Sequence, residues 1–86
     1  MGFLANIDDK MKIKSLMEAL IDGEKSIVVI EAEGKFFDSE PLKKMYSIRE
    51  KIENSEHANN FLIEETYDDV QLNGYAATLS ITKKYI

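Results

Sequence analysis

The hydrophobic residues of the first quarter of the chain recur every three or four positions, as they do on one face of an α-helix. Asn6 can cap the start of such a helix, and Gly23 is typical of the position just after a helix end. The pattern therefore predicts a helix from Ile7 to Asp22. The residues of its apolar face are Ile13, Leu16, Met17, Leu20 and Ile21.

The next segment is rich in β-branched residues, which predicts a strand over Ser26–Ala32. The run Ile27-Val28-Val29-Ile30 contains no polar residue, so we expect apolar contacts on both faces of this strand and a central position in a sheet. Glu33-Gly34 predicts a tight turn, which leads into a short returning strand over Lys35–Phe37.

A second amphipathic helix is predicted after Ser39, a capping residue, because Pro41 suits the first turn of a helix. We expect this helix to end near Asn54, where a polar loop over residues 55–60 follows. Its hydrophobic residues fall on one arc of the helix. The residues of this arc are Leu42, Met45, Tyr46, Ile48 and Ile52.

The last part of the chain predicts a long β-hairpin, because Asn73-Gly74 strongly favours a two-residue hairpin turn. The apolar positions change parity between Tyr67 and Val70, so we expect a one-residue bulge at Asp68-Asp69 that restores a single apolar face. The predicted cross-strand pairs are Leu72 with Tyr75, Val70 with Ala77, and Glu64 with Lys83.

The predicted elements follow the order α-β-β-α-β-β within a single domain that spans residues 1–86. This order predicts an α+β fold. We expect an antiparallel sheet of about four strands with two helices packed on one face.

Composition narrows the chemistry that such a domain can carry. The chain has no cysteine, which excludes disulfides, thiolate metal sites and cysteine nucleophiles. Its 16 acidic and 11 basic residues give a net charge of −5, which disfavours direct binding to nucleic acid or to an anionic membrane. No apolar run approaches the roughly 20 residues of a membrane span, and the N-terminal residues lack the pattern of a secretion signal. We expect a cytoplasmic protein.

Candidate catalytic groups are few. His57 is the single histidine, and its polar surroundings predict a solvated loop residue. The sequence contains no nucleotide-binding glycine motif, nucleophile elbow or paired-histidine metal motif. We expect no enzyme activity, no cofactor and no bound metal, with acid–base chemistry by paired carboxylates as the open alternative. The carboxylates in question are Glu31, Glu33, Glu64 and Glu65.

Acidic residues concentrate in the predicted hairpin, since six acids and no Lys or Arg lie between Ile52 and Thr82. A row of carboxylates on a strand can dock on a basic surface of a partner. The alternative is that these charges only prevent edge-to-edge aggregation of an outer strand. The residues of the predicted acidic ridge are Glu64, Glu65, Asp68 and Asp69.

Arg49 is unusual because helical periodicity places it inside the apolar arc of the second helix. One interpretation is that its guanidinium reaches water or a carboxylate of the sheet. The other is that Leu42, Tyr46 and Arg49 form part of a surface for a partner or a second copy.

The lysines of both helices recur at spacings that place them on common faces, Lys10 with Lys14 and Lys44 with Lys51. Such a face can bind phosphate. Acidic residues are interspersed on the same helices and no aromatic residues interleave, so a solvated helix surface is the favoured interpretation.

We therefore expect a non-enzymatic regulatory or accessory module that binds another protein, for example as an inhibitor of a protein with a basic surface. A structural homo-oligomer, assembled through a sheet edge or a helix face, is the alternative. Nucleic-acid binding through the helical lysines is a weaker one. The candidate partner-binding residues are Glu64, Glu65, Asp68, Asp69, Arg49 and Tyr46.

Overall fold

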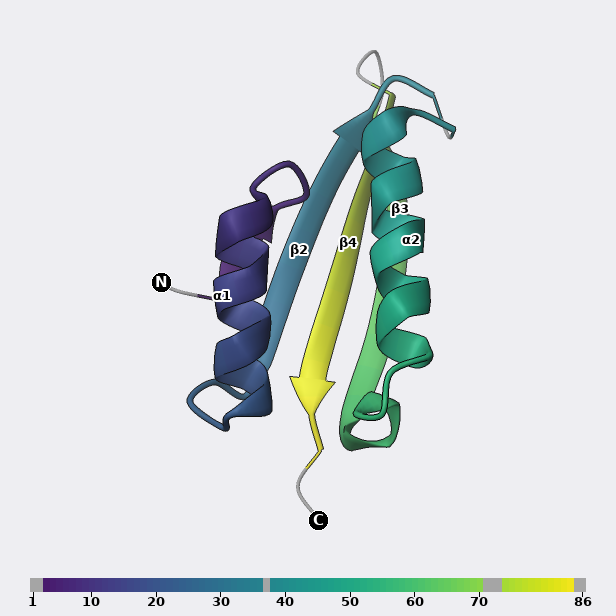
Figure 1. Ribbon diagram of the computed structural model, residues 1–86. Coiled ribbons are helices and arrows are strands. Elements are labelled where there is room, and N and C mark those ends of the chain that lie inside the picture. The colour runs from purple at the N-terminus through teal and green to yellow at the C-terminus, as the bar shows by residue number, and fades with distance from the viewer. Residues whose placement is uncertain (1–2, 37, 71–73, 85–86) are drawn as a thin grey trace.

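Four strands form one mixed sheet, and two helices pack against it (Figure 1). The computed structural model describes residues 3–36, 38–70 and 74–84. The α+β class, the two helices, the total of four strands and three of the four strands expected from the sequence are confirmed. In chain order the elements are β1 (Leu4–Asn6), α1 (Lys10–Ile21), β2 (Ile27–Gly34), α2 (Glu40–Glu53), the 3-10 turn η1 (Ala58–Asn60), β3 (Phe61–Val70) and β4 (Gly74–Lys83).

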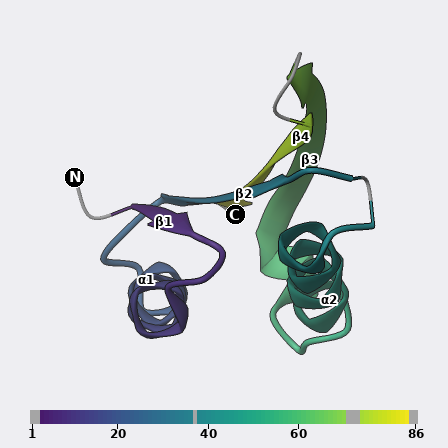
Figure 2. The same ribbon diagram turned by 90° about the horizontal axis from the view of Figure 1, so that it is seen from above.

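The strands lie in the order β1-β2-β4-β3. β2 and β4 form an antiparallel pair at the centre, with β3 antiparallel to β4 at one edge and β1 parallel to β2 at the other. Figure 2 shows both helices on the same side of the sheet, as expected from the sequence. This side is called the helical face below, and the side without a described helix is called the open sheet face.

β1 is a strand that the sequence pattern did not predict. Because it pairs in parallel with β2, the sheet is mixed rather than antiparallel throughout. α1 consequently begins at Lys10 and not at Ile7. Its N-cap is Asp9, whose side chain accepts a hydrogen bond from the Lys12 amide at 3.1 Å. A strand of three residues is too short for its alternation to be recognised in a sequence.

The predicted turn at Glu33-Gly34 and the returning strand after it are wrong, because both turn residues belong to β2. Phe36 lies in a bend, where its amide donates to Ser39 Oγ at 2.8 Å and its carbonyl accepts from the Ser39 amide at 3.0 Å. Phe37 lies outside the described residues. The bend carries the chain from β2 into α2, and the predicted central position of β2 is confirmed.

The hairpin of β3 and β4 is confirmed, but its predicted register is wrong. Val70 pairs with Gly74, and the pairing continues without a bulge to Phe61 opposite Lys83. Residues 71–73 separate the two strands, so the connection is longer than a two-residue turn at Asn73-Gly74. Leu72 and Asn73 themselves lie outside the described residues.

The observed register places Glu64 opposite Ser80 rather than Lys83. Phe61, Ile63 and Tyr67 share one side of β3 in this register, and they pack on the core. No bulge is therefore needed to keep an apolar face along the strand.

The core lies between the sheet and the two helices, and its side chains come from both layers. In the described part of the chain, no helix is long and apolar enough to cross a membrane. The largest fully buried side chains are Leu20, Val28, Ile30, Leu42, Met45, Leu79 and Ile81.

Position 74 requires glycine for two reasons, its backbone conformation and the atoms that surround it. Its φ is +96°, and an added Cβ would lie 2.3 Å from the carbonyl oxygen of Gly34. Gly23 has a φ of +84°, but the nearest atom to an added Cβ is the flexible Nζ of Lys83, at 3.4 Å. We expect Gly23→Ala to lower the free energy of unfolding by about 1 kcal/mol, and Gly74→Ala to lower it by at least about 1 kcal/mol more.

Urea unfolding of the two variants beside the wild type measures this difference. Because both positions share a left-handed backbone, Gly23→Ala controls for the conformational cost alone. Equal losses in the two variants would contradict the close approach of Gly74 to β2.

Candidate functional site

The four carboxylates predicted to form one acidic ridge are divided between the two faces of the sheet. Glu64 and Asp68 are exposed and lie on the open sheet face. Glu65 lies on the helical face, where its side chain is only 8% exposed. Asp69 pairs with Tyr75 through the backbone, and its side chain is not among the described parts of the structure. The ridge is therefore not a single surface.

Glu65 is held by Arg49, which reaches it from α2. The guanidinium Nη1 donates a hydrogen bond to Glu65 Oε2, and Nε lies 3.4 Å from Glu53 Oε1 one helical turn away. The Glu65 carboxylate raises the pKa of Arg49, so the guanidinium keeps its charge. Of the two interpretations of Arg49, the structure shows the one in which it reaches a carboxylate of the sheet.

Two tyrosines complete this contact between α2 and β3. The rings of Tyr46 and Tyr67 lie 5.9 Å apart between centroids. Burial raises the pKa of Tyr67, and the neighbouring Glu65 carboxylate raises it further. We call Tyr46, Arg49, Glu65 and Tyr67 the α2–β3 clamp. Leu42 is fully buried, so it is not part of an exposed surface with Tyr46 and Arg49.

The open sheet face carries exposed carboxylates on both sides of a strip of small residues. Glu31 and Glu33 project from β2, and Glu64 and Asp68 project from β3. Among the described strand residues on this side, none is Lys or Arg. We call these four carboxylates the acidic sheet face. The strip between them, from β4, consists of Ala76, Thr78, Ser80 and Thr82.

Sequence reasoning considered Glu31 and Glu33 only as catalytic carboxylates and missed their place on this surface. The sequence signal that could have found them is the alternation of side chains between the two faces of a strand. Glu31 and Glu33 flank Ala32, which is buried on the helical face of β2. Glu33 and Asp68 lie in one row of the sheet, on either side of Ala76.

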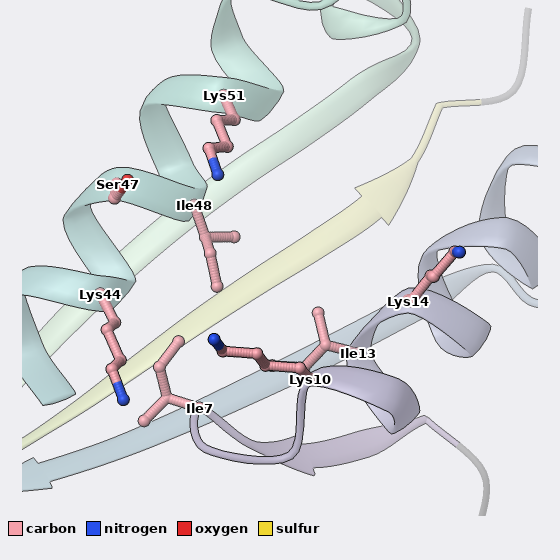
Figure 3. A pocket seen from close by; sticks show the side chains of 8 residues that line it. All are labelled: Ile7, Lys10, Ile13, Lys14, Lys44, Ser47, Ile48 and Lys51. Atoms are coloured by element: carbon pink, nitrogen blue, oxygen red, sulfur yellow. The ribbon is translucent and has the colours of Figure 1, made fainter.

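A groove of about 410 Å³ separates α1 from α2 on the helical face (Figure 3). Helical periodicity in the sequence placed Lys10 with Lys14 on one helix face and Lys44 with Lys51 on another. In the structure, these two faces line the two sides of the groove. Lys44 forms an ion pair with Asp8 at 3.1 Å, which ties the start of α1 to α2. We call this feature the lysine groove. Its lining residues are Ile7, Lys10, Ile13, Lys14, Lys44, Ser47, Ile48 and Lys51.

His57 lies beside η1, at the end of α2 that leads into β3. Its Nε2 is 3.5 Å from Glu56 Oε1, and its ring centroid is 6.4 Å from that of Phe61. Among the residues that the structure describes, no three His, Asp or Glu side chains gather in a way that could hold a metal ion.

No protein-family model matches the sequence, and a comparison with curated protein sequences finds no match. The geometry and charge of the acidic sheet face and the lysine groove are therefore the features that indicate a function.

The α2–β3 clamp should contribute strongly to stability, because removal of Arg49 leaves the Glu65 carboxylate nearly buried without its cation. We expect Arg49→Ala to lower the free energy of unfolding by about 2 kcal/mol, below the full cost of breaking a buried pair because Arg49 is itself partly exposed. Glu53→Gln removes only the exposed partner of Arg49, and we expect a loss below about 0.5 kcal/mol. Urea unfolding measures both, and similar losses would contradict the clamp.

Tyr67 should make stability depend on pH in the alkaline range. Its pKa is raised in the folded state, so above about pH 10 the unfolded chain releases this proton while the folded chain keeps it. Stability from this group is complete below pH 10 and is lost as the pH rises. Between pH 9 and 11, we expect the stability of wild type relative to Tyr67→Phe to fall by about 1.4 kcal/mol. Parallel stability curves for the two proteins would contradict the raised pKa.

Proposed function

We propose that the protein is a non-enzymatic binding module that docks a basic surface of a partner protein on its acidic sheet face. The observation that carries this proposal is the grouping of Glu31, Glu33, Glu64 and Asp68 on the side of the sheet without a described helix. Exposed carboxylates of one sign steer a basic partner and fix its orientation.

The shape of this face supports docking of a broad surface. β4 contributes only small side chains to the centre, so a partner can approach the backbone of the sheet closely. β2 and β3 are two strand spacings apart, which places their carboxylates about 9 to 10 Å from each other. Carboxylates spread over an open face at this separation suit several Lys or Arg side chains of a partner better than one small substrate.

The proposed residues differ from those expected from the sequence. Glu64 and Asp68 remain, and Glu31 and Glu33 join them. Glu65, Arg49 and Tyr46 are assigned to the α2–β3 clamp, where their substitution would change stability together with any binding. The charge neutralisation that tests the surface must therefore leave Glu65 in place.

Neutralising the two β3 carboxylates of the acidic sheet face should abolish capture of the partner. We expect the double variant Glu64→Gln, Asp68→Asn, immobilised as bait in a nuclease-treated lysate of the native host, to lose a stoichiometric protein that wild type retains. The matched control is Glu18→Gln with Glu50→Gln, which removes the same charge from exposed positions of α1 and α2. The control should retain the protein at wild-type level.

Two outcomes of this capture would contradict the proposal. One is retention of the same protein by all three baits, which would place the contact elsewhere. The other is the absence of any stoichiometric partner for wild type. Thermal unfolding of the three baits in parallel separates a lost surface from a lost fold.

Self-assembly is a second candidate function, favoured by the position of β3. This strand is ten residues long and lies at one edge of the sheet, with β4 as its paired neighbour. A second copy could add its own β3 to this edge. Carboxylates on β3 oppose such pairing, because acidic side chains are a common protection of edge strands. A molar mass that rises with concentration in light scattering would favour self-assembly over the binding module.

A further inference from the structure

We propose that the lysine groove binds a small amphiphilic anion, an apolar chain that ends in a phosphate or carboxylate group. The groove lies on the helical face, so this site is separate from the acidic sheet face and does not depend on the function proposed above. Its volume of about 410 Å³ falls within the range of small-molecule sites.

The floor of the groove is apolar. Ile7 and Ile13 are largely covered, at 2% and 8% exposure, and half-buried Ile48 faces them from α2. Because Ile7 and Ile13 are already almost fully covered, a hydrocarbon chain placed between the helices would remove from water mainly its own surface and that of Ile48, which is favourable by about 25 cal/mol per Å² of apolar surface. The floor therefore selects for a ligand with an apolar body.

The rims of the groove are positively charged. In Figure 3, Lys10 and Lys44 extend from the two helices toward Ile7, and Lys51 extends toward Ile48. The ammonium of Lys14 lies farther along α1. Within the described residues, Lys44 is the one of these four that has an ion pair with a carboxylate. The rims therefore select for an anionic head.

The collection of four lysines at one groove has a cost that an anion would relieve. Like charges repel across the gap between the helices, even though the chain as a whole has a net charge of −5. A phosphate or carboxylate between Lys10 and Lys51 would be attracted by both helices at once. The lysine stems would cover the apolar chain of the ligand, as lysine stems commonly cover apolar surface.

The lining favours an amphiphile over a nucleic acid. None of the eight lining residues is aromatic, so the groove offers no surface on which bases could stack. It also has more apolar character than a phosphate backbone requires, because three of its residues are isoleucines.

Dodecyl phosphate, used below its micelle-forming concentration, is the probe for this site. We expect saturable one-to-one binding by calorimetry, with amide chemical shift changes in a ¹H–¹⁵N spectrum centred on Ile7, Ile13 and Ile48. The variant Lys10→Gln with Lys51→Gln should bind about fivefold or more weakly, since exposed charge pairs each contribute up to about 1 kcal/mol.

The matched control is Lys12→Gln with Lys43→Gln, which removes the same charge from the same two helices outside the groove. We expect it to bind dodecyl phosphate within about twofold of wild type, since more distant charges are screened by salt. The four lysines substituted in these two variants are exposed, so neither variant should alter the fold. The ¹H–¹⁵N spectra of the variants verify this directly. Equal weakening in the two variants would overturn the proposal, because bulk charge alone would explain the binding.

Three further ligands complete the test. Dodecyltrimethylammonium has the same chain with a cationic head, and inorganic phosphate has the head without the chain, so we expect both to bind at least about tenfold more weakly. Equal binding of either would overturn the amphiphile assignment. Tighter binding of a ten-residue oligothymidylate would assign the groove to nucleic acid instead. No binding of dodecyl phosphate at millimolar concentration would also overturn the proposal.

Discussion

The pairing of β3 with β4 determines which side chains face the helices and which face outward. Because the pairing runs without a bulge from end to end of β3, alternate residues keep one orientation along the whole strand. Glu65 therefore faces α2, where Arg49 neutralises it, and Glu64 and Asp68 face away from the core. A shift by one residue would bury these two acids without a cation, at a cost of several kcal/mol each. The acidic sheet face and the α2–β3 clamp both depend on this single register.

The sheet also separates two surfaces of opposite charge. The net charge of −5 describes neither of them, because the described strand residues of the open sheet face include four carboxylates and no Lys or Arg, whereas four lysines line the groove. The two proposed ligands, a basic protein surface and an amphiphilic anion, would approach from opposite sides and would not compete for space. The hydrogen-bonded sheet lies between the two surfaces and separates them.

Local periodicity in the sequence was sufficient to predict both helices and the existence of the C-terminal hairpin. It was insufficient for β1, because three residues show no alternation, and for the hairpin register, because Asn73-Gly74 suggested a shorter connection than the one observed. The α2–β3 clamp was predicted only in part. The position of Arg49 in an apolar arc suggested that its guanidinium contacts a carboxylate of the sheet, but it did not identify that carboxylate as Glu65. The lysine groove was not predicted, because sequence periodicity orients lysines on each helix but does not say which helix faces which.

β4 occupies the centre of the sheet although it is the last of the four strands in the sequence. During synthesis on the ribosome, β2 and both helices therefore emerge before the strand that joins them to β3 exists. Until residues 74–83 follow, β2 keeps one unpaired edge and the helices keep part of their apolar faces uncovered. Completion of the sheet must then wait for long-range pairing of β4 with β2 and β3.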